Sequence, residues 1–311
     1  MRKTLIAFVL ALIAALSCTA CGAPSSPSGD DTIRIAATTY PVYLFTTAVT
    51  EGAEGIQVEL MIQQTTSCLH DYTLTVNDMK VVESADVLIM NGGGLEDFLS
   101  DALSASSAAV IDCSVGIPLL DSHGHDHDHT GGHDHGHDHG HDHEDDPHFW
   151  MSTEWAAVML QNICTGLSQI DPDNAPLYES NLQASLEMIP QNTLRAISSI
   201  RPHLITFHDG FHYFAQDSHM VLLKSIEEEE GAEASSADIK EIIELIRTHD
   251  IPAIFTEVNG SQSTAQAIAR ETGVEVYALN LLMSGGGSGM QPYVDAMEEN
   301  YATIVQALGV H

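Results

Sequence analysis

The chain has 311 residues and carries 44 acidic side chains against 10 basic ones, which gives a formal net charge of −34 at pH 7. This charge argues against nucleic acids and anionic substrates as partners, because the protein would repel both. Residues 32–311, which follow the N-terminal segments described next, are long enough for one large domain or two ordinary ones.

Residues 1–20 have the pattern of a lipoprotein signal peptide. An apolar stretch at 5–16 follows two basic residues and is too short to span a bilayer. Small residues then precede Cys21, which we expect to be the lipidated residue, with Cys18 as the second candidate. Residues 21–31 are rich in Pro, Ser and Gly and predict a flexible tether. The body of the protein is therefore expected outside the cytoplasm, attached to the cell membrane by a lipid anchor.

Three cysteines remain in the body of the chain, Cys68, Cys113 and Cys164, and none belongs to a C-x-x-C pair. A disulfide between Cys68 and Cys113 is compatible with a location outside the cell, and free thiols are the alternative. The residues alone leave both interpretations open.

The body of the chain alternates short apolar runs with helix-like stretches. The runs lie at 33–37, 58–62, 87–90 and 109–112, and in a second series at 204–207, 221–224, 253–258 and 274–279. The helix-like stretches lie near 41–51, 75–84, 95–104, 153–168, 236–249, 261–272 and 291–307. This alternation predicts β-α-β units, and therefore an α/β fold with mostly parallel sheets.

The two series of strands predict two βα lobes, an N-terminal one at 32–172 and a C-terminal one at 202–311. A long helix over 173–201 is expected to join them, although Pro190 should kink it or weaken its middle. Ligands of open parallel sheets bind beyond the carboxyl ends of the strands. A binding site is therefore expected in the cleft between the lobes.

Ten histidines, with no apolar residue among them, occupy residues 122–144. They are His123, His125, His127, His129, His133, His135, His137, His139, His141 and His143. Imidazole is a common ligand for zinc and its first-row neighbours, and the interleaved aspartates add oxygen donors. Because the segment has too little apolar surface to fold, we predict a mobile auxiliary metal loop at 121–147. Flexible ligands impose no coordination geometry, so metal selectivity has to come from another site.

Three other histidines stand where predicted strands of both lobes end. His70 follows the second strand, His148 lies just after the histidine-rich loop, and His208 ends the strand at 204–207. Together they predict an interlobe metal site, whereas one histidine alone is more often a solvated side chain. A helix is expected to begin only after His208, which spoils the geometry for chelation by His208 and His212 together. The remaining histidines are expected at the surface or in packing: His203, His219, His249 and His311.

Further motifs accompany these histidines over residues 33–308. They are H-D-Y (70–72), N-D-M-K (77–80), A-D-V-L-I-M-N-G (85–92), L-E-D-F (95–98), D-P-H-F-W (146–150), H-D-G-F-H-Y-F (208–214), A-E-A-S-S-A-D-I (232–239), I-F-T-E (254–257) and Y-V-D-A-M-E-E-N (293–300). With them the chain resembles the solute-binding lipoproteins of ABC-type zinc and manganese importers. The resemblance implies His70, His148 and His208 as metal ligands. A histidine-rich loop just before D-P-H is also a feature of the zinc-type members of that family.

Two features depart from the family pattern. Proline is usual on both sides of the first histidine block, where this chain has Leu69 and Thr73. The family often supplies an aspartate after its last strand, where this chain has Asn280, a neutral and weaker oxygen donor. The fourth ligand therefore stays open between water, Asn280 and Glu257. Glu257 could equally hold a ligand histidine through the other nitrogen of its ring.

The expected ligands bear on the choice of metal. Three imidazoles with an open or water-filled fourth position suit tetrahedral zinc, whereas manganese prefers sites richer in carboxylates. Zn²⁺ is therefore expected as the transported ligand, and Mn²⁺ is the alternative.

These features predict the extracytoplasmic subunit of an ABC importer, a monomer that captures Zn²⁺ and delivers it to a membrane permease. The alternatives are a manganese-binding importer subunit, and a surface zinc store, sensor or adhesin that is not coupled to transport. A zinc hydrolase is disfavoured, because the sequence has no H-E-x-x-H motif and no evident general base apart from Glu257. The protein is therefore expected not to be an enzyme.

Overall fold

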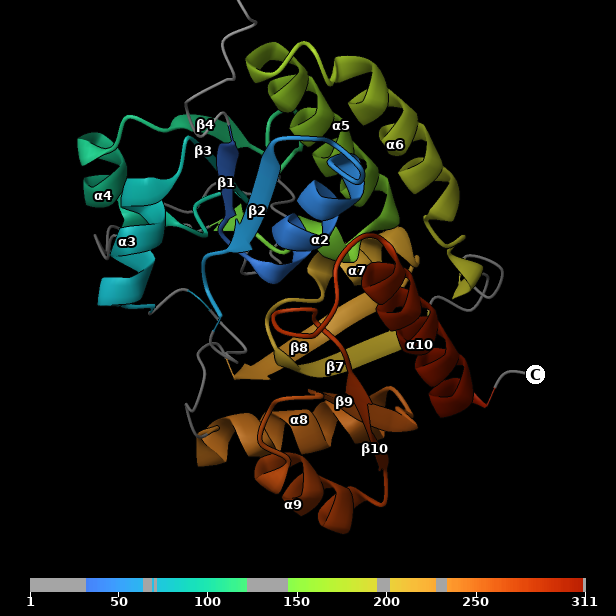
Figure 1. The fold of residues 1–311 in the computed structure, drawn as a ribbon. Helices are drawn as coiled ribbons and strands as arrows, with labels where there is room; N and C mark the ends of the chain where they lie inside the picture. Colours follow the sequence, from blue (N-terminus) through green and yellow to red (C-terminus); the bar gives the residue numbers. More distant parts are fainter. Residues whose placement is uncertain are drawn as a thin grey trace, which may run out of the picture. The chain divides into compact units, whose positions relative to one another are not determined.

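The computed structural model describes residues 32–63, 69, 72–121, 145–194, 202–227 and 234–309. Residues Ile33–His311 form one compact unit, which contains two four-stranded parallel sheets with helices beside them (Figure 1). Within the described ranges, no helix is long and apolar enough to cross a membrane. The predicted signal peptide, the tether and Cys21 lie outside the described residues, as do the ten histidines of the predicted loop.

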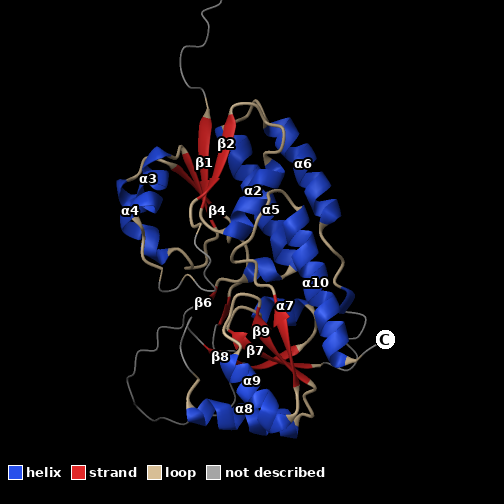
Figure 2. Cartoon of the chain, turned by 60° about the horizontal axis from the view of Figure 1, so that its bottom comes forward, coloured by secondary structure: helices blue, strands red, loops and turns tan. Residues whose placement is uncertain are grey.

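The first sheet has the strand order β2-β1-β3-β4, and all its neighbouring strands are parallel. Its strands are β1 (Ile33–Ala37), β2 (Ile56–Leu60), β3 (Val87–Met90) and β4 (Ala109–Asp112). The helices that follow them are α2 (Tyr40–Val49), α3 (Val76–Ser84), the short η1 (Asp97–Leu99) and α4 (Ser100–Ala105). Figures 1 and 2 both show α3 and α4 on one side of this sheet and α2 on the other.

Burial explains why these segments form strands of a covered sheet. The β3 residues Val87, Leu88 and Ile89 are all fully buried, as expected for a central parallel strand with helices on both faces. A capping box at Thr75 and Asp78 fixes the start of α3. The predicted strands of this half are therefore confirmed, with β2 beginning two residues earlier than the apolar run indicated.

The second sheet has the order β10-β9-β7-β8, again with parallel neighbours. Its strands are β7 (His203–His208), β8 (Val221–Glu227), β9 (Ala253–Glu257) and β10 (Glu275–Leu279). Its helices are α7 (His212–Asp217), α8 (Ser236–Thr248), α9 (Ser263–Thr272) and α10 (Gln291–Leu308). A separate apolar cluster joins this sheet to α8 and α9, with Ile205 and Phe207 packed among Ile242, Ile246 and Ile268.

Between the two sheets in the sequence lie a short β-ribbon and two long helices. The ribbon pairs β5 (Leu120–Asp121) antiparallel to β6 (Asp145–Asp146), and the short η2 (Phe149–Met151) follows it. The helices are α5 (Thr153–Ile170) and α6 (Ala175–Met188), and the Ser152 side chain caps the start of α5. The loop predicted over 121–147 is therefore too long at both ends, because Asp121 and Asp145–Asp146 pair as strands on either side of the ten histidines.

Helix α6 is shorter than the helix predicted over 173–201. It ends at Met188, and residues 189–192 are not helical. Pro190 accounts for this end, because its ring is incompatible with the preceding helical turn and it has no N–H to donate. The side chains of Tyr178 and Leu182 lie on the buried face of α6. The boundaries of the two lobes at 32–172 and 202–311 stay a prediction.

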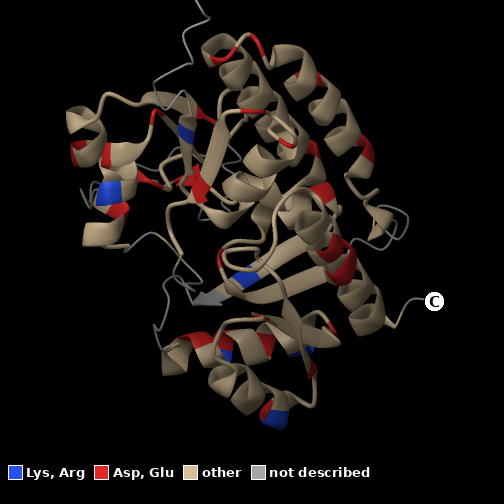
Figure 3. Cartoon of the chain, in the orientation of Figure 1, with Lys and Arg blue, Asp and Glu red and all other residues tan. Residues whose placement is uncertain are grey.

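Cys113 and Cys164 are both buried free thiols. The free-thiol alternative therefore holds for these two residues, and Cys113 is not half of a disulfide with Cys68. Figure 3 shows acidic residues spread over helices and loops, with basic residues at only a few places, in line with the net charge.

Trp150 of η2 ties the middle of the chain to its C-terminal part. Its side chain is fully buried, and its Nε1 donates to the carbonyl of Leu281 at 2.9 Å. The carbonyl of Trp150 in turn accepts from the hydroxyl of Tyr293 at 3.0 Å. These bonds hold the turn that carries His148 against the loop after β10 and against the first turn of α10.

Trp150→Phe is expected to lower the free energy of unfolding by about 2 kcal/mol or more, because it leaves a buried carbonyl unsatisfied and opens a cavity. Thermal or denaturant unfolding of the metal-free protein measures the change. Trp155→Phe, at a partly buried tryptophan on α5, is the matched control and should cost less. Equal losses in the two variants would contradict the role given to Trp150.

Candidate metal centre

His148 lies directly after the β-ribbon and is held by the carboxylate of Asp146. The side chains are 2% and 1% exposed, so both are shielded from water. Asp146 Oδ1 accepts the backbone N–H of His148 at 2.8 Å and lies 2.7 Å from its Nδ1. This contact places the ring proton on Nδ1, which leaves Nε2 as the nitrogen that can bind a metal ion.

A second set of bonds fixes the turn that carries His148. The side-chain amide of Asn91, at the end of β3, donates to the carbonyl of Pro147 at 3.0 Å. The buried carboxylate of Glu96 accepts the backbone N–H groups of Asn91 and Gly92 at 2.8 and 3.0 Å. Gly92 has a φ of +83°, and a Cβ there would collide with Asp112, so glycine is required at this point.

His208 ends β7, beside the end of the neighbouring strand β9. Its Nδ1 lies 3.4 Å from Oε1 of Glu257, the last residue of β9, and both side chains are buried. Adjacent parallel strands bring their carboxyl ends to the same edge of a sheet, which is why these two residues meet.

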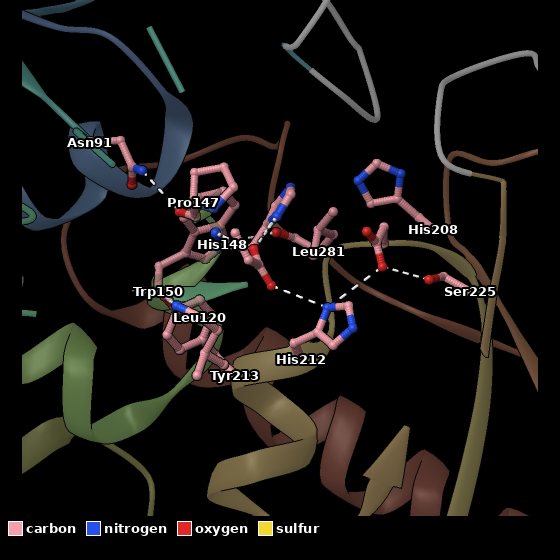
Figure 4. Close-up of polar contacts among 12 residues, drawn as sticks. Asn91, Leu120, Pro147, His148, Trp150, His208, His212, Tyr213, Ser225 and Leu281 are labelled. Carbon is pink, nitrogen blue, oxygen red and sulfur yellow. Dashed lines mark hydrogen bonds and ion pairs between the residues drawn. The ribbon is translucent and has the colours of Figure 1, made fainter. Parts of the chain in front are cut away.

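The imidazoles of His148 and His208 come together although the two residues belong to different parts of the fold. Their ring centroids are 5.3 Å apart and the rings are nearly perpendicular, at 88° (Figure 4). Two imidazoles that bind one ion at about 2.0–2.1 Å with a near-tetrahedral angle have centroids about 5 Å apart. The pair is therefore spaced as two ligands of one metal ion would be.

The other predicted ligands divide into described and undescribed residues. His70 lies outside the described residues, so its role stays a prediction; in the sequence it falls between the buried Leu69 and the partly buried Tyr72. The side-chain oxygen of Asn280 accepts the backbone N–H of Leu282 at 2.8 Å, so this oxygen already takes part in a turn. In the part of the chain that is described, no group of three or more His, Cys, Asp or Glu side chains could hold a metal ion.

Sequence reasoning missed Asp146 and the environment of His212. Nδ1 of His212 lies 3.2 Å from Asp146 Oδ2 and 3.5 Å from Asp209 Oδ1. As expected, α7 begins only at His212, so His208 is not on the same helix. The spacing D-x-H was the available signal for Asp146, because a carboxylate two residues before a histidine can reach its ring. His219 and His249 are exposed and His203 is partly buried, as expected, and His311 is not described.

The charges of these groups are strongly coupled. Burial by itself raises the pKa of Asp146, but the charges and hydrogen bonds of His148 and His212 outweigh it and hold the pKa well below its usual range. Burial lowers the pKa of His212, but the bond to Asp146 and the charges of Asp209 and Asp146 leave it above its usual value. Asp146 is therefore ionised at neutral pH.

The described residues combine two parallel sheets with a buried pair of histidines, each beside a carboxylate. Residues 35–307 match the family model described as zinc-uptake complex component A, periplasmic, and the chain belongs to this family.

Individual relatives agree with this assignment. The chain is 30% identical to the zinc-binding lipoprotein AdcA of Streptococcus pneumoniae over 97% of its own length, but it spans only 60% of that protein. It is 23% identical to the manganese-binding lipoprotein MntA of Halalkalibacterium halodurans over 99% of both chains. The crystal structure of the Zn(II)-bound ZnuA-like domain of S. pneumoniae AdcA superposes with a TM-score of 0.69 at 25% identity, covering 89% of this chain and 98% of that domain. The predicted α/β fold with two lobes is thereby confirmed.

Asp146→Asn is expected to weaken zinc binding about 10- to 100-fold, because the carboxylate that orients the ring of His148 is lost. Competition with a zinc chelator measures the affinity. Asp145→Asn is the matched control, since Asp145 is exposed on the same short strand. An affinity that falls equally in both variants would mean that general surface charge, and not the contact with His148, governs binding.

Proposed function

We propose that the chain is the extracytoplasmic zinc-binding subunit of an ABC-type metal importer, which captures Zn²⁺ and delivers it to a membrane permease. The observation that carries this proposal is the buried pair of His148 and His208, 5.3 Å apart and drawn from separate parts of the fold. A site assembled from two lobes suits capture and release, because it can be opened when the lobes separate. Membership of the zinc-uptake family supports the same conclusion.

For the ligands, we propose His70, His148 and His208. Glu257 is placed to orient His208, since its Oε1 lies beside Nδ1 of that ring and leaves Nε2 for the ion. Asn280 contributes less, because its side-chain oxygen already accepts the N–H of Leu282. The fourth position is then filled by water or by a shift of Glu257.

Zinc is favoured over manganese by the donor atoms. The described pair offers imidazole nitrogens, which suit zinc, whereas manganese favours carboxylate and other oxygen donors. The ten histidines at 123–143 are proposed to gather the same ion near the protein.

The remaining parts of the proposal concern location and partners. We assign Cys21 as the lipid attachment point and residues 21–31 as the tether. The protein acts as a monomer outside the cytoplasm and has no enzymatic activity of its own. A surface zinc store, sensor or adhesin that is not coupled to transport is the competing function, and it does not require a tight site between the lobes.

Zinc affinity is expected to fall as the pH drops below about 6.5, because each imidazole has to be unprotonated to bind the ion. Protons and zinc compete for the same nitrogens, so the apparent dissociation constant should rise steadily towards pH 5. Chelator competition over pH 5–8 measures it. Tight zinc uptake that is unchanged at pH 5 would contradict a site built from imidazoles.

The decisive experiment is a zinc titration of a variant in which the dipeptide Asn-Gly replaces residues 122–144. This replacement keeps Leu120–Asp121 and Asp145–Asp146, which pair as β5 and β6, and supplies the tight turn that an antiparallel pair needs. We expect one tightly bound ion in the deletion variant and its loss on adding His208→Ala. His219→Asn is the control, since it removes an exposed histidine and asparagine tolerates the positive φ of that position. No tight ion after the deletion would favour the store or sensor.

A further inference from the structure

His212, the first residue of α7, lies between two carboxylates that belong to the two metal-binding segments. Its Nδ1 is 3.2 Å from Asp146 Oδ2 and 3.5 Å from Asp209 Oδ1 (Figure 4). Asp146 precedes His148 by two residues, and Asp209 directly follows His208. One imidazole outside the ligand set therefore contacts both segments.

The two carboxylates are joined to their metal-binding segments by different contacts. The other oxygen of Asp146, Oδ1, accepts the backbone N–H of His148 and lies beside Nδ1 of its ring. Asp209 is itself fixed by the hydroxyl of Ser225 on β8, which donates to Asp209 Oδ1 at 2.5 Å. The contacts thus run without interruption from β8, through Asp209, His212 and Asp146, to His148.

Burial makes the contact at His212 necessary. The carboxylate of Asp146 is 1% exposed, and a buried ionised carboxylate is costly unless hydrogen bonds and opposite charge compensate it. The Nδ1–H of His148 serves only one of its two oxygens. Nδ1 of His212 lies 3.2 Å from the other oxygen, so a protonated His212 places the opposite charge beside it.

We propose that His212 is a positioning residue for the metal site, which fixes the imidazole of His148 relative to the strand that ends in His208 by bridging Asp146 and Asp209. The inference rests on the proposed function, because it assigns to His212 a task in holding zinc between the two lobes. His212 acts through the two aspartates and is not itself a ligand.

The test compares His212→Leu with His212→Asn in the full chain. Leucine removes the donor, whereas the side-chain amide of asparagine can take the place of Nδ1–H. We expect His212→Leu to release zinc to excess chelator about tenfold faster than the unmodified protein, in the lower part of the range for residues that orient metal ligands. His212→Asn should recover most of the difference, and the control His219→Asn should release zinc at the unmodified rate.

Two spectroscopic measurements separate positioning from a merely structural role and from ligation. The visible absorption of the Co²⁺-loaded protein should change in His212→Leu, because the angle between the two imidazoles changes. The number of imidazoles around zinc, counted by X-ray absorption, should stay the same in His212→Leu and fall by one in His208→Ala.

Several results would overturn the inference. Unmodified zinc release and an unmodified cobalt spectrum in His212→Leu would show that the bridge does not govern the site, and loss of one imidazole would make His212 a ligand. Equally fast release in His212→Leu and His212→Asn would exclude the polar contacts of Nδ1 as the cause. If His212→Leu does not fold, Ser225→Ala, which loosens Asp209, must accelerate release. A lack of tight zinc binding in the unmodified chain would instead overturn the proposed function.

Discussion

The carboxylate of Asp146 is the point at which the packing of the fold and the chemistry of the site meet. It is buried and ionised, so the protein has to compensate its charge, and it does so with the hydrogen bonds of His148 and the ion pair with His212. The same bonds orient the ring of His148 and connect it to α7 beside the second sheet. The buried charge of Asp146 is thus stabilised by His148 and His212, and it orients these same two side chains.

On the side of the first sheet, several hydrogen bonds fix the segment that contains Asp146 and His148. Asn91 and Glu96 hold the turn of Pro147 from the first sheet, and Trp150 clamps the same segment to the loop after β10. On the other side, the ends of β7 and β9 set His208 against Glu257. Each half of the candidate site therefore takes its geometry from the end of a parallel strand, and the ion would join the two halves.

Much of this could be predicted from the sequence, because parallel sheets have strong local signals. Continuous apolar runs such as 87–90 marked buried strands, and the shared edge of a parallel sheet placed His208 at a strand end near Glu257. The contact between Asp146 and His212 could not be predicted, since no local pattern relates residues of two different lobes. The helix predicted over 173–201 was too long. Its apolar stripe continues beyond Met188, but Pro190 ends α6 there.

The position of the metal ion between His148 and His208 can be measured by anomalous X-ray diffraction at the zinc edge from crystals of the zinc-loaded protein. We expect one strong peak within about 2.0–2.1 Å of Nε2 of both residues, with Nδ1 of each still facing its carboxylate. A strong peak elsewhere in the ordered protein, with none between these two rings, would contradict this position.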